Sequence, residues 1–330
     1  MSRRRAWLVH LLWIAPLAAF VGSLLVGRYP LSFASLLQGL GEGSTSLAGS
    51  ILWRVRLPRA IAAGLVGANL GLTGALFQGV FRNPLVDSRI LGVSSGAAFG
   101  AALALLVGSP AAVQGGAFLS GLAAVGLLLL LGARFGFSPL VLVVTGVLVG
   151  AFFSSLLGLV TYVADPLRTL PAITFWLLGG LGGTRWGDLV PVAAVSTPGL
   201  LLLLALRWRL NLLSLSDAEA GALGVNAKVF RPLAVAAGTL LVSASVSISG
   251  MIGWVGLIVP HVGRAIVGSD QAKLLPASAA LGATTLLVLD AIARSALPGE
   301  IPLGVLTGIV GVPAFLAVLR VFLRRRGEAR

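Results

Sequence analysis

The residues of this chain best suited to chemistry are clustered arginines. Arg54, Arg56 and Arg59 fall within six positions, among apolar neighbours. A guanidinium group keeps its charge and carries several N–H donors in a fixed plane, so clustered arginines bind carboxylates well. The cluster predicts a docking surface for an acidic partner. The simpler alternative is that long cationic side chains extend from an apolar region towards water.

The chain has few residues suited to metal binding or catalysis. The chain has no cysteine, which excludes disulfides and thiolate metal sites, and its only histidines are His10 and His261, too few for a histidine-based metal centre. Asp290 is the acid most deeply placed in an apolar run, and Arg294 one helical turn later is its expected partner. We therefore expect no catalytic residues and no bound metal.

No nucleotide-binding loop is present, because neither lysine follows a glycine as the G-x-x-x-x-G-K-[ST] motif requires. The chain is therefore expected to bind no cofactor of its own. If it takes part in ATP-driven transport, ATP and Mg²⁺ must be bound by partner ATPase subunits.

The elements that position these residues are apolar helices. Mean hydropathy is +1.02, and only 10% of residues are charged, against roughly 25% in soluble domains. Lone strands cannot span lipid, so the fold class is an all-α polytopic membrane protein with about ten transmembrane helices. The expected spans are 6–27, 58–80, 89–108, 113–133, 139–163, 188–207, 230–250, 254–267, 272–293 and 302–323, with a re-entrant or interfacial piece at 170–183.

The basic residues indicate an orientation. A net charge of +14 could suggest nucleic acid, but a membrane protein enriches its cytoplasmic loops in Lys and Arg, and we expect no nucleic-acid partner. With both termini inside, 17 of the 24 basic residues fall on the inner side. The apolar run from Ala6 to Val26 is too long for a signal-peptide core and is interpreted as an uncleaved first span. The seven basic residues outside are Arg28, Arg54, Arg56, Arg59, Arg168, Arg185 and Arg294.

Small residues indicate how the spans pack. Glycines recur four positions apart, which allows close backbone approach between helices in lipid, and residues 1–330 are expected to form one transmembrane domain. In the seventh span, Ser243, Ser245, Ser247 and Ser249 scatter over more than one helical face, so packing or bonding to the helix backbone is favoured over a polar pore. The spaced glycines are Gly67 and Gly71, Gly92, Gly96 and Gly100, Gly146 and Gly150, and Gly304 and Gly308.

The longest inward loop, 207–231, predicts a protein-docking element. Ser216 can cap a short helix that contains Asp217 and Glu219. Gly224 then ends this helix. Exposed leucines between charged flanks predict an apolar docking patch, the alternative being a helix that lies on lipid headgroups. These leucines are Leu212, Leu213, Leu215 and Leu223.

Five blocks, in order along nearly the whole chain, resemble the FecCD family of permeases, which import cobalamin, iron-siderophores and haem. The blocks are RLPR at 56–59, QGVFRNPL with LGVSSGAAFG at 78–100, FWLLGGLGG with Trp186 at 175–186, GWVGLIVPHVGR at 253–264 and DAIARSALPGEIPLGVLTGIVGVPAF at 290–315.

This resemblance implies a type II ABC importer permease in the bacterial cytoplasmic (inner) membrane, with ten helices per subunit and both termini cytoplasmic. Its partners would be a second copy of the chain, two cytoplasmic ABC ATPase subunits, an extracytoplasmic substrate-binding protein and membrane lipid. A heterodimer with a paralogous permease stays open as an alternative to the homodimer. The resting state, inward- or outward-facing, also stays open.

The resemblance also assigns residues. It implies that Arg56, Arg59 and Arg294 dock acidic residues of the binding protein, and that coupling helices at 211–226 contact the ATPase. The family often has Leu-Gly-Glu where this chain has Leu215-Ser216-Asp217. The cytoplasmic gate would comprise Asn83, Leu85, Ser138 and Pro139, with Pro139 replacing the family's usual polar residue.

The function expected from these observations is that of the permease of an ATP-driven importer that moves a metal chelate, foremost an iron-siderophore, by alternating access. Haem, cobalamin and oxyanion cargoes stay open. An ion-coupled secondary transporter is the alternative from another class, but its mid-membrane ionisable sites are lacking here, because most acids lie at span ends. An intramembrane enzyme is a third and weaker alternative.

Overall fold

The structure, a computed structural model, describes residues 3–29 and 31–327, and every regular element in these ranges is helical. The all-α expectation is confirmed. Residues 1, 2 and 328–330, whose cytoplasmic placement the sequence predicts, lie outside the described residues. The long helices are α1 (Arg3–Leu25), α4 (Leu57–Val80), α6 (Val113–Phe135), α7 (Pro139–Val163), α9 (Trp186–Ala205), α12 (Ala227–Ser249), α14 (Gln271–Ser295) and α15 (Leu303–Gly327).

Shorter elements connect and cap these helices. The short helices are α2 (Phe33–Glu42), α3 (Leu47–Ile51), α5 (Val93–Leu106), α8 (Thr169–Leu178), α10 (Arg207–Leu213), α11 (Asp217–Ala222) and α13 (Val255–Val267). Single turns are η1 (Gly43–Thr45), the π-helical η2 (Leu52–Arg56) and η3 (Pro110–Ala112). The sequence did not predict helices between residues 33 and 51. The piece predicted at 170–183 is helical only as far as Leu178.

In the part of the chain that the structure describes, six helical stretches are long and apolar enough to cross a membrane, and each overlaps a predicted span. Residues in α1, α5, α13 and α15 match the other four predicted spans, but their apolar parts are shorter. The protein is thus polytopic, and six of the ten expected spans meet the length and hydropathy requirement. The six stretches are Leu47–Val80, Pro110–Phe135, Pro139–Val163, Trp186–Ala205, Ala227–Ser249 and Gln271–Ser295.

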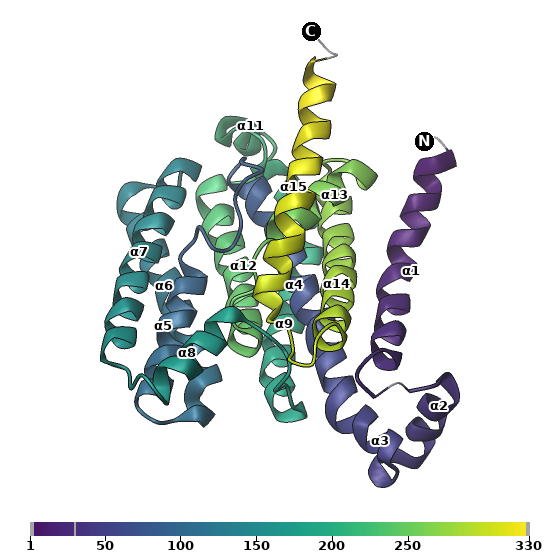
Figure 1. The fold of residues 1–330 in the computed structure, drawn as a ribbon. Helices are drawn as coiled ribbons and strands as arrows, with labels where there is room; N and C mark the ends of the chain where they lie inside the picture. Colours follow the sequence, from purple (N-terminus) through teal and green to yellow (C-terminus); the bar gives the residue numbers. More distant parts are fainter. Residues whose placement is uncertain (1–2, 30, 328–330) are drawn as a thin grey trace.

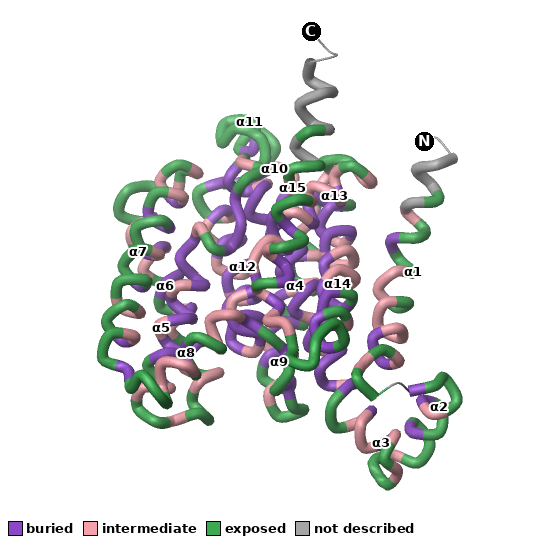
Figure 2. The backbone as a smooth tube through the Cα atoms, viewed as in Figure 1, coloured by how far each residue is buried: buried purple, intermediate pink, exposed green. Residues whose placement is uncertain are grey.

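Helices α4 and α12 occupy the centre of the bundle and are the most buried of these six stretches, while α7 exposes much of its outer face (Figure 2). α4 packs most closely on α14. A methyl group added at Gly67 would overlap the carbonyl oxygen of Gly282, and one at Gly71 would overlap that of Ser278. Carbonyl oxygens of α14 therefore occupy the space that side chains at these two positions of α4 would need, which confirms close helix packing through Gly67 and Gly71.

The two ends of the bundle differ. Figure 1 places α11, the first described residues of α1 and the last of α15 towards one end, and α2, α3 and α8 towards the other. We name them the inner and outer ends, after the predicted orientation. At the outer end, Ser32 and Ser46 cap α2 and α3, and Trp53 donates from Nε1 to the Gly39 carbonyl at 3.1 Å. Serine caps and this tryptophan thus stabilise a helical hairpin in a glycine- and serine-rich segment.

Candidate functional site

A buried ion pair joins the outer ends of α4 and α14. Arg59 donates from Nε to Oδ1 and Oδ2 of Asp290 at 2.9 and 3.1 Å, and its Nη2 lies 2.9 Å from Oδ1. The two side chains are 5% and 1% exposed. The expected contact between Asp290 and Arg294 is present at 3.8 Å, but Arg59 is the closer partner. Because both charges are buried, loss of Arg59 would leave the Asp290 carboxylate with only its longer contact to Arg294.

Glu300 completes this outer cluster from the loop between α14 and α15. Arg59 donates from Nη1 to both carboxylate oxygens of Glu300, at 2.9 and 3.0 Å. The Glu300 side chain is 45% exposed, unlike that of Asp290. Both Arg59 and Glu300 line a cavity of about 540 Å³ that α8 borders. A methyl group at Gly182 would stand 2.8 Å from Glu300 Oε2, so the glycine-rich segment after α8 makes room for the carboxylate.

The other two arginines predicted to dock a partner cap the outer end of α1. Arg56 donates to the carbonyls of Leu24, Leu25 and Tyr29, and Arg294 donates to that of Ser23. The last carbonyls of a helix have no partner within it and form the negative end of its dipole, so guanidinium groups stabilise them.

The structure therefore holds Arg56, Arg59 and Arg294 inside the chain, at 4%, 4% and 6% exposure. Their docking role stays a prediction, and among the described residues Arg59 alone of the three pairs with a carboxylate that is substantially exposed, that of Glu300. Two other arginines at this end, Arg54 and Arg185, are exposed. They lie next to Trp53 and Trp186, and Trp186 donates from Nε1 to the Trp53 carbonyl at 2.7 Å. This bond brings two solvent-facing charges to the outer end.

At the inner end, the loop after α4 carries half of the predicted gate. Asn83 Oδ1 accepts from the Leu85 backbone N–H at 2.9 Å, and the Leu85 side chain is 56% exposed. Arg82 has a φ of 52°, in the left-handed region that few non-glycine residues occupy. Its side chain donates to the Leu213 carbonyl at 3.3 Å and to Asp217 Oδ1 at 2.7 Å. The gate loop is thus attached to α10 and α11.

The other half of the predicted gate begins α7. Ser138 caps this helix, accepting from the Val141 backbone N–H at 3.3 Å, and Pro139 is its first residue. Proline suits this position because the first helical N–H has no partner within the helix. Helix initiation therefore accounts for the proline at a place where the family usually has a polar residue.

The predicted docking helix forms as α11. Ser216 and Glu219 make a reciprocal capping box, and Gly224 follows with a φ of 80°. The hydrogen bond from the Ser216 hydroxyl lowers the pKa of Glu219. Hydrogen bonds from Arg231, then Arg82, lower the pKa of Asp217 from 3.8 to about 2. Both carboxylates are therefore ionised at neutral pH.

The predicted leucine patch needs a correction. Leu213 is 0% exposed, because residues 207–213 form helix α10 and turn this side chain into the core. Leu212 is partly buried against the same core. Leu215 and Leu223 are 37% and 60% exposed, and these two leucines form the apolar surface beside α11.

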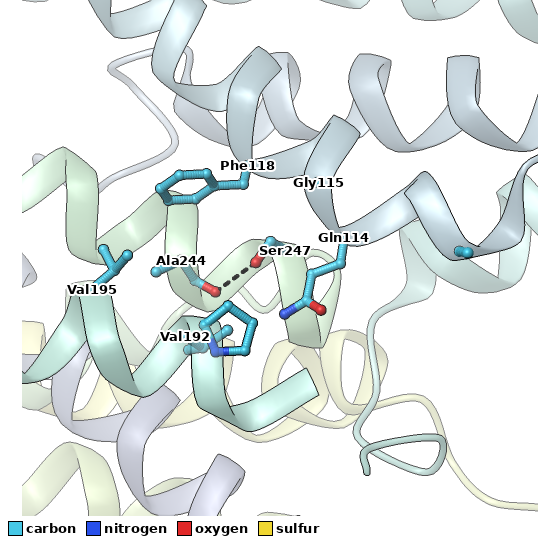
Figure 3. Close-up of a pocket in the computed structure, with 9 residues that line it drawn as sticks. Gln114, Gly115, Phe118, Val192, Val195, Ala244 and Ser247 are labelled. Atoms are coloured by element: carbon cyan, nitrogen blue, oxygen red, sulfur yellow. Dashed lines mark hydrogen bonds between the residues drawn. The ribbon is translucent and has the colours of Figure 1, made fainter. Parts of the chain in front are cut away.

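Three of the four serines predicted in α12 bond to their own helix, while the buried Ser243 hydroxyl has no partner among the described residues. Ser245, Ser247 and Ser249 each donate to a carbonyl three or four residues earlier, as expected from the sequence. Figure 3 shows Ser247 beside a pocket of about 200 Å³ between α6, α9 and α12. Gln114, also at this pocket, donates to the Asp188 carbonyl at 2.9 Å. These side chains are engaged within the bundle, and most of the remaining wall is apolar.

These features define a class of protein. The chain is a polytopic, all-helical membrane protein whose charged clusters lie at the two ends of an apolar bundle, as a permease requires. Among the described residues, no group of three or more His, Asp and Glu side chains could hold a metal ion.

The chain belongs to the FecCD transport family, whose model matches residues 14–321. It is 42% identical over 316 residues to the molybdate import system permease protein MolB of Haemophilus influenzae, covering 92% of each chain. It is 41% identical over 280 residues to a Helicobacter pylori protein assigned as an iron chelatin transport system permease, covering 84% of this chain and 83% of that one. A solved inward-facing structure of a transporter assigned to the metal-chelate ABC type superposes with a TM-score of 0.87, at 38% identity over 96% of this chain and 99% of that one.

Proposed function

We propose that this chain is the membrane-spanning subunit of an ABC importer that carries a metal chelate, an iron-siderophore, across the bacterial inner membrane. One observation carries the proposal: a TM-score of 0.87 over 96% of the chain to an inward-facing transporter of the metal-chelate type. A fold shared at 38% identity over this length supports the same architecture and the same alternating-access cycle. On this proposal the chain itself performs no catalysis.

The proposed assembly has a second copy of the chain, two ATPase subunits at the inner end and one binding protein at the outer end. The exposed leucines beside α11 support ATPase docking, since apolar surface at an inner loop has no role in solubility. The exposed apolar face of α7 supports contact with lipid or with the second copy.

The proposed gate comprises Asn83 and Leu85 after α4, with Ser138 and Pro139 at the start of α7. The exposure of Leu85 supports this role, because an apolar side chain beside Asn83 at the inner end can close a path without binding a polar cargo. The turn that Asn83 makes with the Leu85 backbone supports a defined loop conformation.

At the outer end, we propose that the binding protein docks at Arg59 and that one of its carboxylates takes the place of a carboxylate of this chain. Arg59 is held by Asp290 on its Nε side and by Glu300 on its Nη1 side. Glu300 is 45% exposed and belongs to a loop, whereas Asp290 is buried in α14. An acidic residue of a binding protein would therefore replace Glu300, while Asp290 keeps Arg59 in position.

The test is transport by the assembled complex in proteoliposomes, with ATP on the ATPase side and the binding protein on the other. Radiolabelled ferric siderophore, haem, cobalamin and molybdate are supplied in separate arms. ATP-dependent uptake of the ferric siderophore that withstands an uncoupler is the expected result. Uptake of another of these cargoes alone would overturn the cargo assignment, and uptake abolished by the uncoupler while ATP persists would overturn the class of transporter.

A further inference from the structure

One carboxylate at the inner end is connected through two arginines to both halves of the proposed gate. Asp217 is the first residue of α11, where the Ser216–Glu219 capping box fixes the start of the helix. Its Oδ1 accepts from Arg82 at 2.7 Å and from Arg231 at 2.8 Å, and its Oδ2 accepts from Arg231 at 3.2 Å. The Asp217 side chain is 49% exposed, so it lies where a partner that contacts α11 can move it.

Asp217 has two lines of contact, which we call arms. The first arm consists of Arg82 and leads to the loop after α4. Arg82 immediately precedes Asn83, and its φ of 52° is an unfavourable backbone conformation for arginine. Such a conformation persists only where surrounding contacts hold it, and the side-chain bonds of Arg82 go to Asp217 and to the Leu213 carbonyl. The backbone beside Asn83 is thus tied to the position of α11.

The second arm runs through Arg231 to the start of α7. Arg231 is 1% exposed, in the second turn of α12, and its Nη1 donates to the Phe137 carbonyl at 3.0 Å. Phe137 immediately precedes Ser138 and Pro139. Because Arg231 Nη1 also donates to Asp217, one guanidinium joins α11 to the second gate half.

We propose that Asp217 is the positioning residue through which a displacement of α11 reaches both gate halves at once, Arg82 carrying it to Asn83 and Leu85 and Arg231 carrying it to Ser138 and Pro139. The inference rests on the proposed function, because it needs an ATPase that moves α11 and a gate that opens. Charge-assisted bonds of this kind are short and directional, so they transmit a shift of α11 better than apolar contacts of similar area.

The two arms make different predictions. Loss of the Asp217 charge disconnects both gate halves, whereas loss of the Arg82 charge disconnects only the loop after α4. A carboxylate that merely stabilises α11 would produce no such difference, since its removal would reduce assembly and transport together.

The experiment uses the assembled transporter in proteoliposomes, with D217N, D217E and R82Q. Arg134→Gln is the matched control, because Arg134 is an exposed inner arginine at the end of α6, close in sequence to Ser138. Cargo transported per ATP hydrolysed is expected to fall at least five-fold in D217N, to recover largely in D217E and to stay unchanged in R134Q. ATP hydrolysis and co-purification of the ATPase are expected to persist in D217N. An unchanged transport ratio in D217N, or a loss explained by lost assembly, overturns the inference.

Nitroxide labels separate the arms. The chain has no cysteine, so Leu85→Cys or Leu140→Cys places one unique label in each copy, at side chains that are 56% and 73% exposed. ATP should change label mobility at both sites in the otherwise wild-type chain, at neither site in D217N, and at residue 140 alone in R82Q. Responses that survive in D217N overturn this inference alone. Labels that do not respond to ATP in the otherwise wild-type chain overturn the proposed gate, and the inference with it.

Discussion

Glu300 holds Arg59 through both carboxylate oxygens, at 2.9 and 3.0 Å, while the Glu300 side chain remains 45% exposed. An arginine proposed to receive a partner's carboxylate is thus already occupied by a carboxylate of its own chain. Asp290, which is 1% exposed, keeps the opposite side of the same guanidinium. The docking surface is accordingly expected to work by competition.

The first prediction concerns this competition. Glu300→Gln should tighten binding of the substrate-binding protein about three-fold, because it removes the ion pair between the buried Arg59 and the half-exposed Glu300, which opposes docking by ~0.7 kcal/mol. The association is measured by surface plasmon resonance with the permease in nanodiscs. Glu42→Gln is the control, because Glu42 is an exposed outer acid that accepts from Gln38. Weaker binding in E300Q would show that Glu300 itself takes part in docking.

The second prediction concerns the contact between α4 and α14. Gly67→Ala should destabilise the bundle by about 1–3 kcal/mol, because the added methyl overlaps the Gly282 carbonyl and the helices must separate. Gly64→Ala is a control on the same helix, since its methyl would meet only Leu287 Cδ1, at 3.9 Å. Unfolding in detergent measures both variants. Equal stability of G67A and G64A would contradict the close approach.

The third prediction separates packing from docking among the leucines. Leu213→Ala should cost about 2–5 kcal/mol of stability, because Leu213 is 0% exposed in the main core. Leu215→Ala and Leu223→Ala should leave the unfolding midpoint nearly unchanged and weaken ATPase association, because these side chains face solvent. Co-purification of the ATPase is the measurement. Full ATPase retention by the L215A/L223A double variant would argue against the docking patch.

The fourth prediction concerns pH. Arg231 and Arg82 lower the folded-state pKa of Asp217 from 3.8 to about 2, so its ion pairs stabilise the folded state fully above pH 3.8. This contribution is lost as the pH falls from 3.8 to about 2, where the carboxylate protonates in both states. The unfolding midpoint of the wild type minus that of D217N should therefore stay constant from neutral pH to about 4 and shrink below. A difference that changes near pH 6 would implicate another titrating group.

Local signals made much of the fold predictable. Long apolar runs bounded by proline, glycine or charge located the spans, and Ser216 with Glu219 located α11, because capping depends on residues three positions apart. Helices α2 and α3 were missed because the Gly-Ser-rich segment between them has the composition of a loop. Their stability comes from serine caps and from the Trp53 bond to Gly39, which lies 14 positions away.

The sequence predicted which residues belong to the candidate sites, but not which residues they contact. The sequence indicated Arg294 as the partner of Asp290 because the two lie one helical turn apart. The closer partner is Arg59, 231 positions away, and Glu300 is 241 positions from Arg59. Likewise, Leu213 was expected on the surface with its neighbours, because the seven-residue helix that buries it shows too little periodicity to reveal its inner face.

The capping of α1 by distant arginines has a consequence for biogenesis. The first helix enters the membrane early in synthesis, but the Leu24 carbonyl gains its donor only when Arg56 has been made, 32 residues later. The Ser23 carbonyl gains its donor from Arg294, 271 residues later. The outer end of the first helix therefore gains its last side-chain donor only after most of the chain has been synthesised.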